Sequence, residues 1–135
     1  MRFDAVEACE IADLWMLHPA TVAKFKWFDP AKGERDYKAM PEAALAVVAR
    51  NNESFARFCW EPYMHNPKLK HRLRRVKAKT LLVWGENDGI VTPAYGRALA
   101  ERVPDATMAV IAQAGHYPHL EQPSTFVEHL RGFFV

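Results

Sequence analysis

The chain has 135 residues, enough for one domain. Half of the residues are hydrophobic and a quarter are charged, which excludes a disordered chain, and the formal net charge of +2 indicates no particular partner. Two cysteines, Cys9 and Cys59, cannot form a disulfide framework, so we expect a reducing, cytoplasmic compartment. The sequence contains no run of about 18 apolar residues, so it predicts no membrane span. Residues 1–7 do not resemble a signal peptide.

The first part of the sequence predicts helices. Residues 11–28 are expected to be helical with a break near Pro19, and the polar segment 29–40 is expected to be a loop. From Pro41 to Trp60 the apolar positions fit an amphipathic helix, because proline is tolerated in a first helical turn. An asparagine pair at residues 51–52 could interrupt this helix.

A short basic helix is expected next. Asn66 and Pro67 favour a helix start, since asparagine caps the helix and proline fits its first turn. Leu69, Leu73 and Val76 then fall on one face. The other face carries five basic residues, Lys68, Lys70, Arg72, Arg74 and Arg75. Because no aromatic residues are interleaved with them for stacking on bases, we expect a solvated helix face and no nucleic-acid partner.

The second part of the sequence changes to short, continuous apolar runs. Residues 80–84, closed by a glycine, match a strand buried on both faces of a parallel sheet. A helix is expected from Thr92 to about Val103, a strand from Thr107 to Ile111, and a last helix from Pro123. Strand, helix, strand and helix in this order predict a βαβ crossover followed by a helix. Two parallel strands do not make a stable sheet by themselves, so we expect the end of a larger sheet.

Two candidate catalytic residues follow the two predicted strands. Asp88 lies in Gly-Glu-Asn-Asp-Gly after the first strand, and His116 lies in Ala-Gly-His-Tyr-Pro after the second. The loops at the carboxyl edge of a parallel sheet form its ligand crevice, and neighbouring strands lie about 4.8 Å apart, so the two side chains can meet. A carboxylate in such a pair fixes the imidazole tautomer and stabilises the imidazolium. Taken singly, each residue has another interpretation that stays open: Asp88 as a turn residue, and His116 as a residue that caps the strand end.

These two segments, with the helix between them, resemble the closing part of the α/β-hydrolase fold. In that family an acid follows the penultimate strand in a Gly-x-x-Asp turn, and a histidine follows the last strand in a Gly-His turn, often trailed by Glu-x-Pro. The resemblance implies that Asp88 is the catalytic acid and His116 the catalytic histidine. His119 and Glu121 are interpreted as structural. His116 and His119 form an H-x-x-H pair, but no third ligand is evident, so we expect no metal and no cofactor.

The helical first part resembles the cap that α/β-hydrolases insert before the penultimate strand. The chain is therefore interpreted as an α/β protein, the C-terminal portion of this fold, with a helical cap segment over residues 1–75 and a parallel βαβα unit over 76–135. Caps line the substrate pocket in this family. The resemblance thus implies four candidate substrate-binding residues, Trp60, Tyr63, Met64 and His65. The alternative is that these residues form the core of the cap.

The nucleophile elbow of this fold, Gly-x-Ser-x-Gly, does not occur in the sequence. The two serines, Ser54 and Ser124, have no glycine two residues away, and no Asp or Cys occupies such a turn. We expect a hydrolase of esters, or of related carbonyl or C–C bonds, whose chain is inactive alone because it lacks the nucleophile. The expected partners are a small hydrophobic ester-like substrate and either a missing N-terminal half or a second copy. A non-catalytic ligand- or protein-binding module derived from a hydrolase is the alternative.

Overall fold

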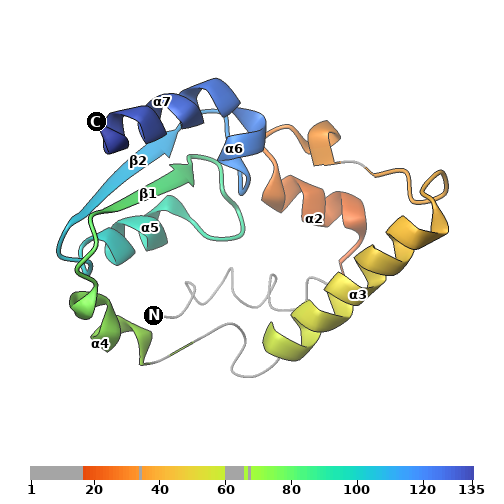
Figure 1. Ribbon diagram of the computed structural model, residues 1–135. Helices are drawn as coiled ribbons and strands as arrows, with labels where there is room; N and C mark the ends of the chain where they lie inside the picture. The colour runs from red at the N-terminus through yellow and green to blue at the C-terminus, as the bar shows by residue number, and fades with distance from the viewer. Residues whose placement is uncertain (1–16, 34, 60–65, 67) are drawn as a thin grey trace.

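The computed structural model describes residues 17–33, 35–59, 66 and 68–135 (Figure 1). The elements in chain order are α2 (Pro19–Lys26), the 3-10 turn η1 (Pro30–Gly33), α3 (Glu42–Cys59), α4 (Leu69–Arg72), the 3-10 turn η2 (Leu73–Arg75), β1 (Thr80–Gly85), α5 (Pro93–Ala100), β2 (Ala106–Ile111), α6 (Pro118–Glu121) and α7 (Pro123–Phe134). The boundary expected between residues 75 and 76 stays a prediction.

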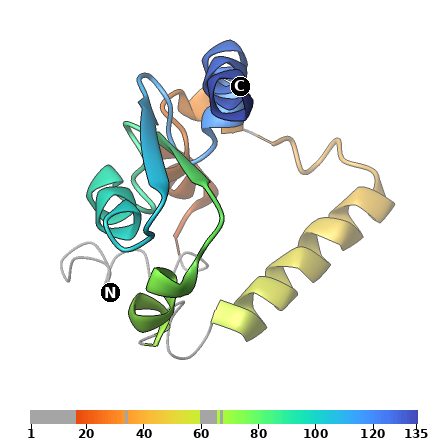
Figure 2. The same ribbon diagram turned by 60° about the vertical axis from the view of Figure 1, so that its left-hand side comes forward.

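The sheet consists of β1 and β2 side by side and parallel. Thr80 lies opposite Ala106 at one end, and Gly85 lies opposite Ile111 at the other. The two strands are joined through α5, and α5 and α7 contact both strands from opposite sides (Figure 2). The predicted βαβ crossover and closing helix are therefore confirmed. Both strands point toward α6 and α2, so the loops that follow them open at that edge (Figure 1).

α5 packs close to the sheet because it presents a glycine at the contact. Gly96 is buried, and a methyl group there would lie 2.7 Å from Met108 Cε and 2.9 Å from the Trp84 ring. The Trp84 indole N–H donates a 2.7 Å hydrogen bond to the carbonyl of Val91, just before α5 begins. This bond fixes the far end of the loop that leaves β1.

Most of the best-buried side chains lie around the loops after the strands, and Val103 lies between α5 and β2. The buried apolar residues are Ile90, Val103, Ile111 and Ala114, and the buried polar ones are Asp88 and Glu121. Most residues of β1 and β2 are only half-buried, and Val110 is 38% exposed. The prediction of a strand fully buried on both faces is therefore wrong for β1. A sheet of two strands leaves one edge of each strand uncovered.

The helical first part differs from its prediction in four places. α2 begins at Pro19 instead of breaking there, because proline fits the first helical turn. It ends at Lys26 instead of Phe28. Residues 11–16 lie outside the described part. The expected loop contains η1. α3 runs without interruption through the asparagine pair, since asparagine costs a helix interior only about 0.7 kcal/mol. The predicted basic helix is a single turn, α4, followed by the tighter turn η2.

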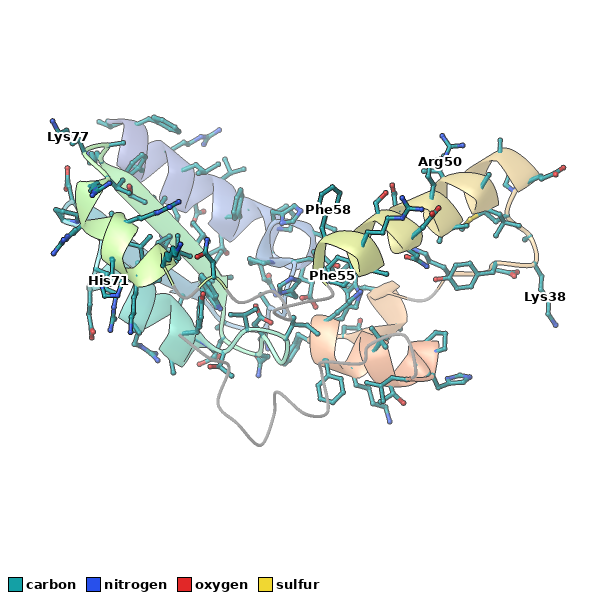
Figure 3. All side chains as sticks on the ribbon, turned by 90° about the horizontal axis from the view of Figure 1, so that it is seen from below. Lys38, Arg50, Phe55, Phe58, His71 and Lys77 are labelled. Atoms are coloured by element: carbon teal, nitrogen blue, oxygen red, sulfur yellow. The ribbon has the colours of Figure 1, made fainter. Side chains whose placement is uncertain are left out.

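The short basic segment and α3 lie at different ends of the molecule. Asn66 does not cap α4: its side chain accepts the N–H of Lys68, and Lys68 is the residue that precedes the helix. The five basic side chains of the predicted face are all exposed, and none forms an ion pair with a described acidic residue. In Figure 3, His71 and Lys77 lie far from α3, where Phe58 is 88% exposed.

Candidate active site

Asp88 is held rigidly in the loop between β1 and α5, the acid loop (residues 86–92). Its side chain is 5% exposed, and Oδ1 accepts hydrogen bonds from the backbone N–H groups of Ile90 and Val91, both at 2.9 Å. These two bonds fix the side-chain torsions of Asp88. Its second oxygen, Oδ2, is left directed toward the neighbouring loop.

His116 lies in the loop between β2 and α6, the histidine loop (residues 112–117), and meets that oxygen. His116 Nδ1 lies 2.9 Å from Asp88 Oδ2. The imidazole is 34% exposed, and its Nε2 has no hydrogen-bond partner among the described residues. A neutral ring that donates Nδ1–H to the carboxylate keeps its lone pair at Nε2, so this nitrogen can accept a proton.

The acid and histidine loops are bonded directly to each other beyond the ends of the strands. The N–H of Glu86 donates to the carbonyl of Ile111, the last residue of β2, and the N–H of Asn87 donates to the carbonyl of Ala114 in the histidine loop, both at 2.9 Å. This close approach requires a glycine at position 85, because a Cβ there would collide with the carbonyl oxygens of Ala114 and Gly115. The strand pairing thus extends into the loops that carry Asp88 and His116.

A third segment, residues 25–29 at the end of α2, contacts both loops; we call it the brace segment. The carbonyl of Phe25 accepts the N–H of Gly89 at 3.0 Å, and the carbonyl of Lys26 accepts the N–H of His116 at 2.7 Å. Burial lowers the pKa of the Lys26 ammonium, and the nearby charge of Arg35 lowers it further. The brace segment therefore holds the acid loop and the histidine loop through its main chain.

Glu121, on α6, fastens the histidine loop to the brace segment. Oε1 accepts the N–H groups of Phe28 at 2.8 Å and Asp29 at 3.2 Å, and Oε2 accepts the N–H of Gly115 at 2.6 Å. The sequence indicated a structural residue here but not its partners. Those partners are backbone N–H groups, two of them more than 90 positions away, and no side-chain pattern reveals them.

The structure brings Asp88 and His116 together as the sequence predicts, and their catalytic role stays a prediction. The four candidate pocket residues, Trp60, Tyr63, Met64 and His65, lie outside the described residues. His119 is exposed on α6 and packs its ring near Phe126, with centroids 5.8 Å apart. The described ranges contain no group of three His, Cys, Asp or Glu side chains placed to hold a metal ion. They also contain no helix long and apolar enough to cross a bilayer.

Comparison with known proteins assigns the family. Residues 3–129 match the model of the alpha/beta hydrolase family. The chain is 36% identical over 84 residues to the 2-hydroxy-6-oxononadienedioate/2-hydroxy-6-oxononatrienedioate hydrolase of Comamonas testosteroni, a match that covers 60% of this chain and 29% of that protein. It is 25% identical over 107 residues to 3-oxoadipate enol-lactonase 2 of Acinetobacter baylyi, covering 79% of this chain and 39% of that protein.

Solved structures give the same result for the fold. An N-acyl homoserine lactone degrading enzyme matches with a TM-score of 0.60 and 26% identity over 97% of this chain and 52% of that one. A meta-cleavage product hydrolase from Pseudomonas fluorescens matches with a TM-score of 0.66, and its 20% identity supports the fold alone, over 99% of this chain and 52% of that one. The chain thus spans about half the length of these structures and less of the curated relatives. It belongs to the α/β-hydrolase family and has a partial form of that fold, as the two loops and the βαβ unit predicted.

Proposed function

We propose that the complete protein is a hydrolase in which Asp88 orients His116 and His116 transfers the proton. The observation that carries the proposal is the 2.9 Å contact between Asp88 Oδ2 and His116 Nδ1, which leaves Nε2 without a described partner. Nε2 then removes the proton of a nucleophilic hydroxyl as it attacks the carbonyl carbon. The same nitrogen returns this proton to the leaving group, and Asp88 stabilises the imidazolium in between.

The nucleophile is proposed to come from polypeptide outside these 135 residues. Ser54 lies within α3, and Ser124 is the second residue of α7, so neither occupies a strand-to-helix turn. An acyl-enzyme needs that nucleophile, and the oxyanion it forms needs backbone donors placed beside it. We therefore expect no turnover from the 135-residue chain alone.

The proposed substrate is a small hydrophobic molecule with a carbonyl group next to the bond to be cleaved, an ester or a related carbonyl or C–C bond. The names of the relatives support this class. Two of them act on lactones, as an enol-lactonase and as an N-acyl homoserine lactone degrading enzyme. A third is a hydrolase of oxo-dienedioates.

The proposal is tested first on the DNA upstream of the Met1 codon, translated in frame. We expect strands and a Gly-x-Ser-x-Gly elbow there. The long reading frame is then expressed and assayed with p-nitrophenyl butyrate, beside the 135-residue chain. Turnover by the long form that His116→Ala abolishes supports the proposal. Equal turnover by the His116→Ala variant contradicts the role of His116, and turnover by the short chain contradicts the missing nucleophile.

The second candidate is a binding module without catalysis, derived from a hydrolase. It is favoured by exposed apolar side chains on α3, where Val47 is 53% and Phe58 is 88% exposed, because such residues can receive a ligand or a partner protein. A stop codon directly upstream of Met1, with a folded chain that binds p-nitrophenyl butyrate but does not cleave it, would support this candidate.

A further inference from the structure

Glu121 is a buried carboxylate that is hydrogen-bonded to backbone N–H groups. The residue is 4% exposed, and its side chain forms no ion pair with a described side chain. Instead it accepts three N–H bonds, two from Phe28 and Asp29 and one from Gly115. An ionised carboxylate accepts hydrogen bonds at both oxygens and donates none, so three converging N–H donors suit it. The Lys32 ammonium lies near, 3.4 Å from the main-chain carbonyl of Glu121.

The three donors belong to segments far apart in the chain. Phe28 and Asp29 are in the brace segment, and Gly115 directly precedes His116. The brace segment lies close to the histidine loop, since a Cβ at Gly115 would lie 3.0 Å from the Phe28 nitrogen. Glu121 therefore spans the junction between the two segments at the point where the main chain enters His116.

The place of the imidazole depends on this junction. The ring is one-third exposed, and its described side-chain hydrogen bond is the one to Asp88. Asp88 is fixed by its own loop, whereas His116 is fixed through its backbone, whose N–H is bound to the carbonyl of Lys26. A shift of the histidine loop away from the brace segment would lengthen the contact between His116 Nδ1 and Asp88 Oδ2.

We propose that Glu121 is a positioning residue that holds His116 against Asp88 by fastening the histidine loop to the brace segment. The inference rests on the proposed function, because it takes the Asp88–His116 pair as the catalytic one. Glutamine at position 121 has the same size but only one oxygen. It can accept the brace N–H groups or that of Gly115, and its NH2 group would then face the remaining donor.

The test measures the Nδ1 proton of His116 in the 15N-labelled 135-residue chain by NMR. In the wild type we expect a hydrogen-bonded Nδ1–H signal that Asp88→Asn removes. Glu121→Gln is expected to speed the exchange of this proton with water roughly tenfold or more, and to speed the exchange of the Gly115 and His116 amides as well. Two controls, Glu86→Gln in the acid loop and Glu128→Gln on α7, remove exposed carboxylates and should leave these rates within about twofold of wild type.

The outcomes separate this inference from the proposed function. In a wild-type chain whose amide spectrum is that of a folded protein, the absence of an Asp88-dependent Nδ1 signal would contradict the proposed function, and the inference with it. If the short chain is not folded, the same measurements are made on the long reading frame. A wild-type signal whose exchange is unchanged in a folded Glu121→Gln variant would contradict the inference alone, even if that variant melts at a lower temperature. If Glu121→Gln does not fold, Glu121→Asp takes its place. It keeps the charge but is one methylene shorter, and the same acceleration is expected.

Discussion

The two oxygens of Asp88 have different partners: Oδ1 accepts backbone N–H groups, and Oδ2 contacts His116. One substitution can change the second contact and keep the first. Asparagine at this position can keep an oxygen toward the N–H groups of Ile90 and Val91 while placing NH2 opposite His116 Nδ1. The ring would then have to accept at Nδ1 and carry its proton on Nε2, where the base is needed. The proposed function predicts that Asp88→Asn in the complete protein lowers kcat by roughly 10³- to 10⁴-fold with a small change in KM. Initial rates measure this, and a loss of less than tenfold would contradict it.

Gly85 permits the close contact between the acid loop and the histidine loop. A methyl group at this position would overlap the carbonyl oxygens of Ala114 and Gly115, which belong to backbone and cannot rotate away. We expect Gly85→Ala to lower the free energy of unfolding by roughly 2 kcal/mol or more. Urea denaturation of the 135-residue chain checks this value. A loss below about 0.5 kcal/mol would show that the two loops can separate without cost.

The Lys26 side chain gives the fold a specific pH dependence. Because its pKa is lowered in the folded chain, Lys26 binds its proton more tightly in the unfolded chain, and the charge destabilises the fold below the folded-state pKa. This cost vanishes as the pH rises toward the ordinary value of 10.5. Lys26→Met, which keeps the backbone carbonyl bound to His116, should therefore be more stable than wild type at pH 7. Its advantage should shrink by pH 10, and an advantage that grows with pH would contradict the assignment.

Among the elements, α7 contains a glycine whose replacement is expected to stabilise the fold. Gly132 lies near its C-terminal end, and a Cβ there would meet no atom within 4 Å. Glycine costs a helix interior about 0.5–1 kcal/mol relative to alanine, so Gly132→Ala should raise the free energy of unfolding by up to that amount. Urea denaturation of the 135-residue chain measures this change in the free energy of unfolding. Gly85→Ala serves as the comparison, because it is the glycine substitution expected to destabilise the fold. A destabilised Gly132→Ala variant would mean that α7 packs against a surface at this position.

The elements that the sequence predicts well are those with a local pattern. β1, β2 and α7 each show a continuous or periodic apolar run near a glycine or proline. β1 and β2 differ from their predicted bounds by one residue each, and α7 begins at Pro123 as predicted. α6 was missed because four residues carry no readable period. The Asp88–His116 pair was predictable because both residues follow strands of one βαβ unit. The brace segment was not, because its bonds to both loops are made by main-chain groups.

At the scale of the whole molecule, the chain exposes more surface than a compact protein of its mass. Its accessible surface is 9905 Å², and a compact monomer of 15.4 kDa exposes about 7,200 Å². Unfolding therefore uncovers about four-fifths of the usual area, and the urea m-value of the 135-residue chain should be lower than that of an ordinary domain in the same proportion. We expect the long reading frame to restore an m-value normal for its length. An m-value already normal for 135 residues would indicate that the chain is compact, or associated, without added polypeptide.

The bonds made by Glu121 also set an order of events during synthesis. They join residues 92 and 93 positions apart, and the brace segment is translated long before the carboxylate that fastens it. Long-range contacts of this kind form late in folding, after the loop between them has been closed. α2, the sheet and its crossover helix can thus form on the ribosome before the site is secured. A nascent chain that stops short of residue 121 carries both Asp88 and His116 but lacks the group that locks the brace segment to them.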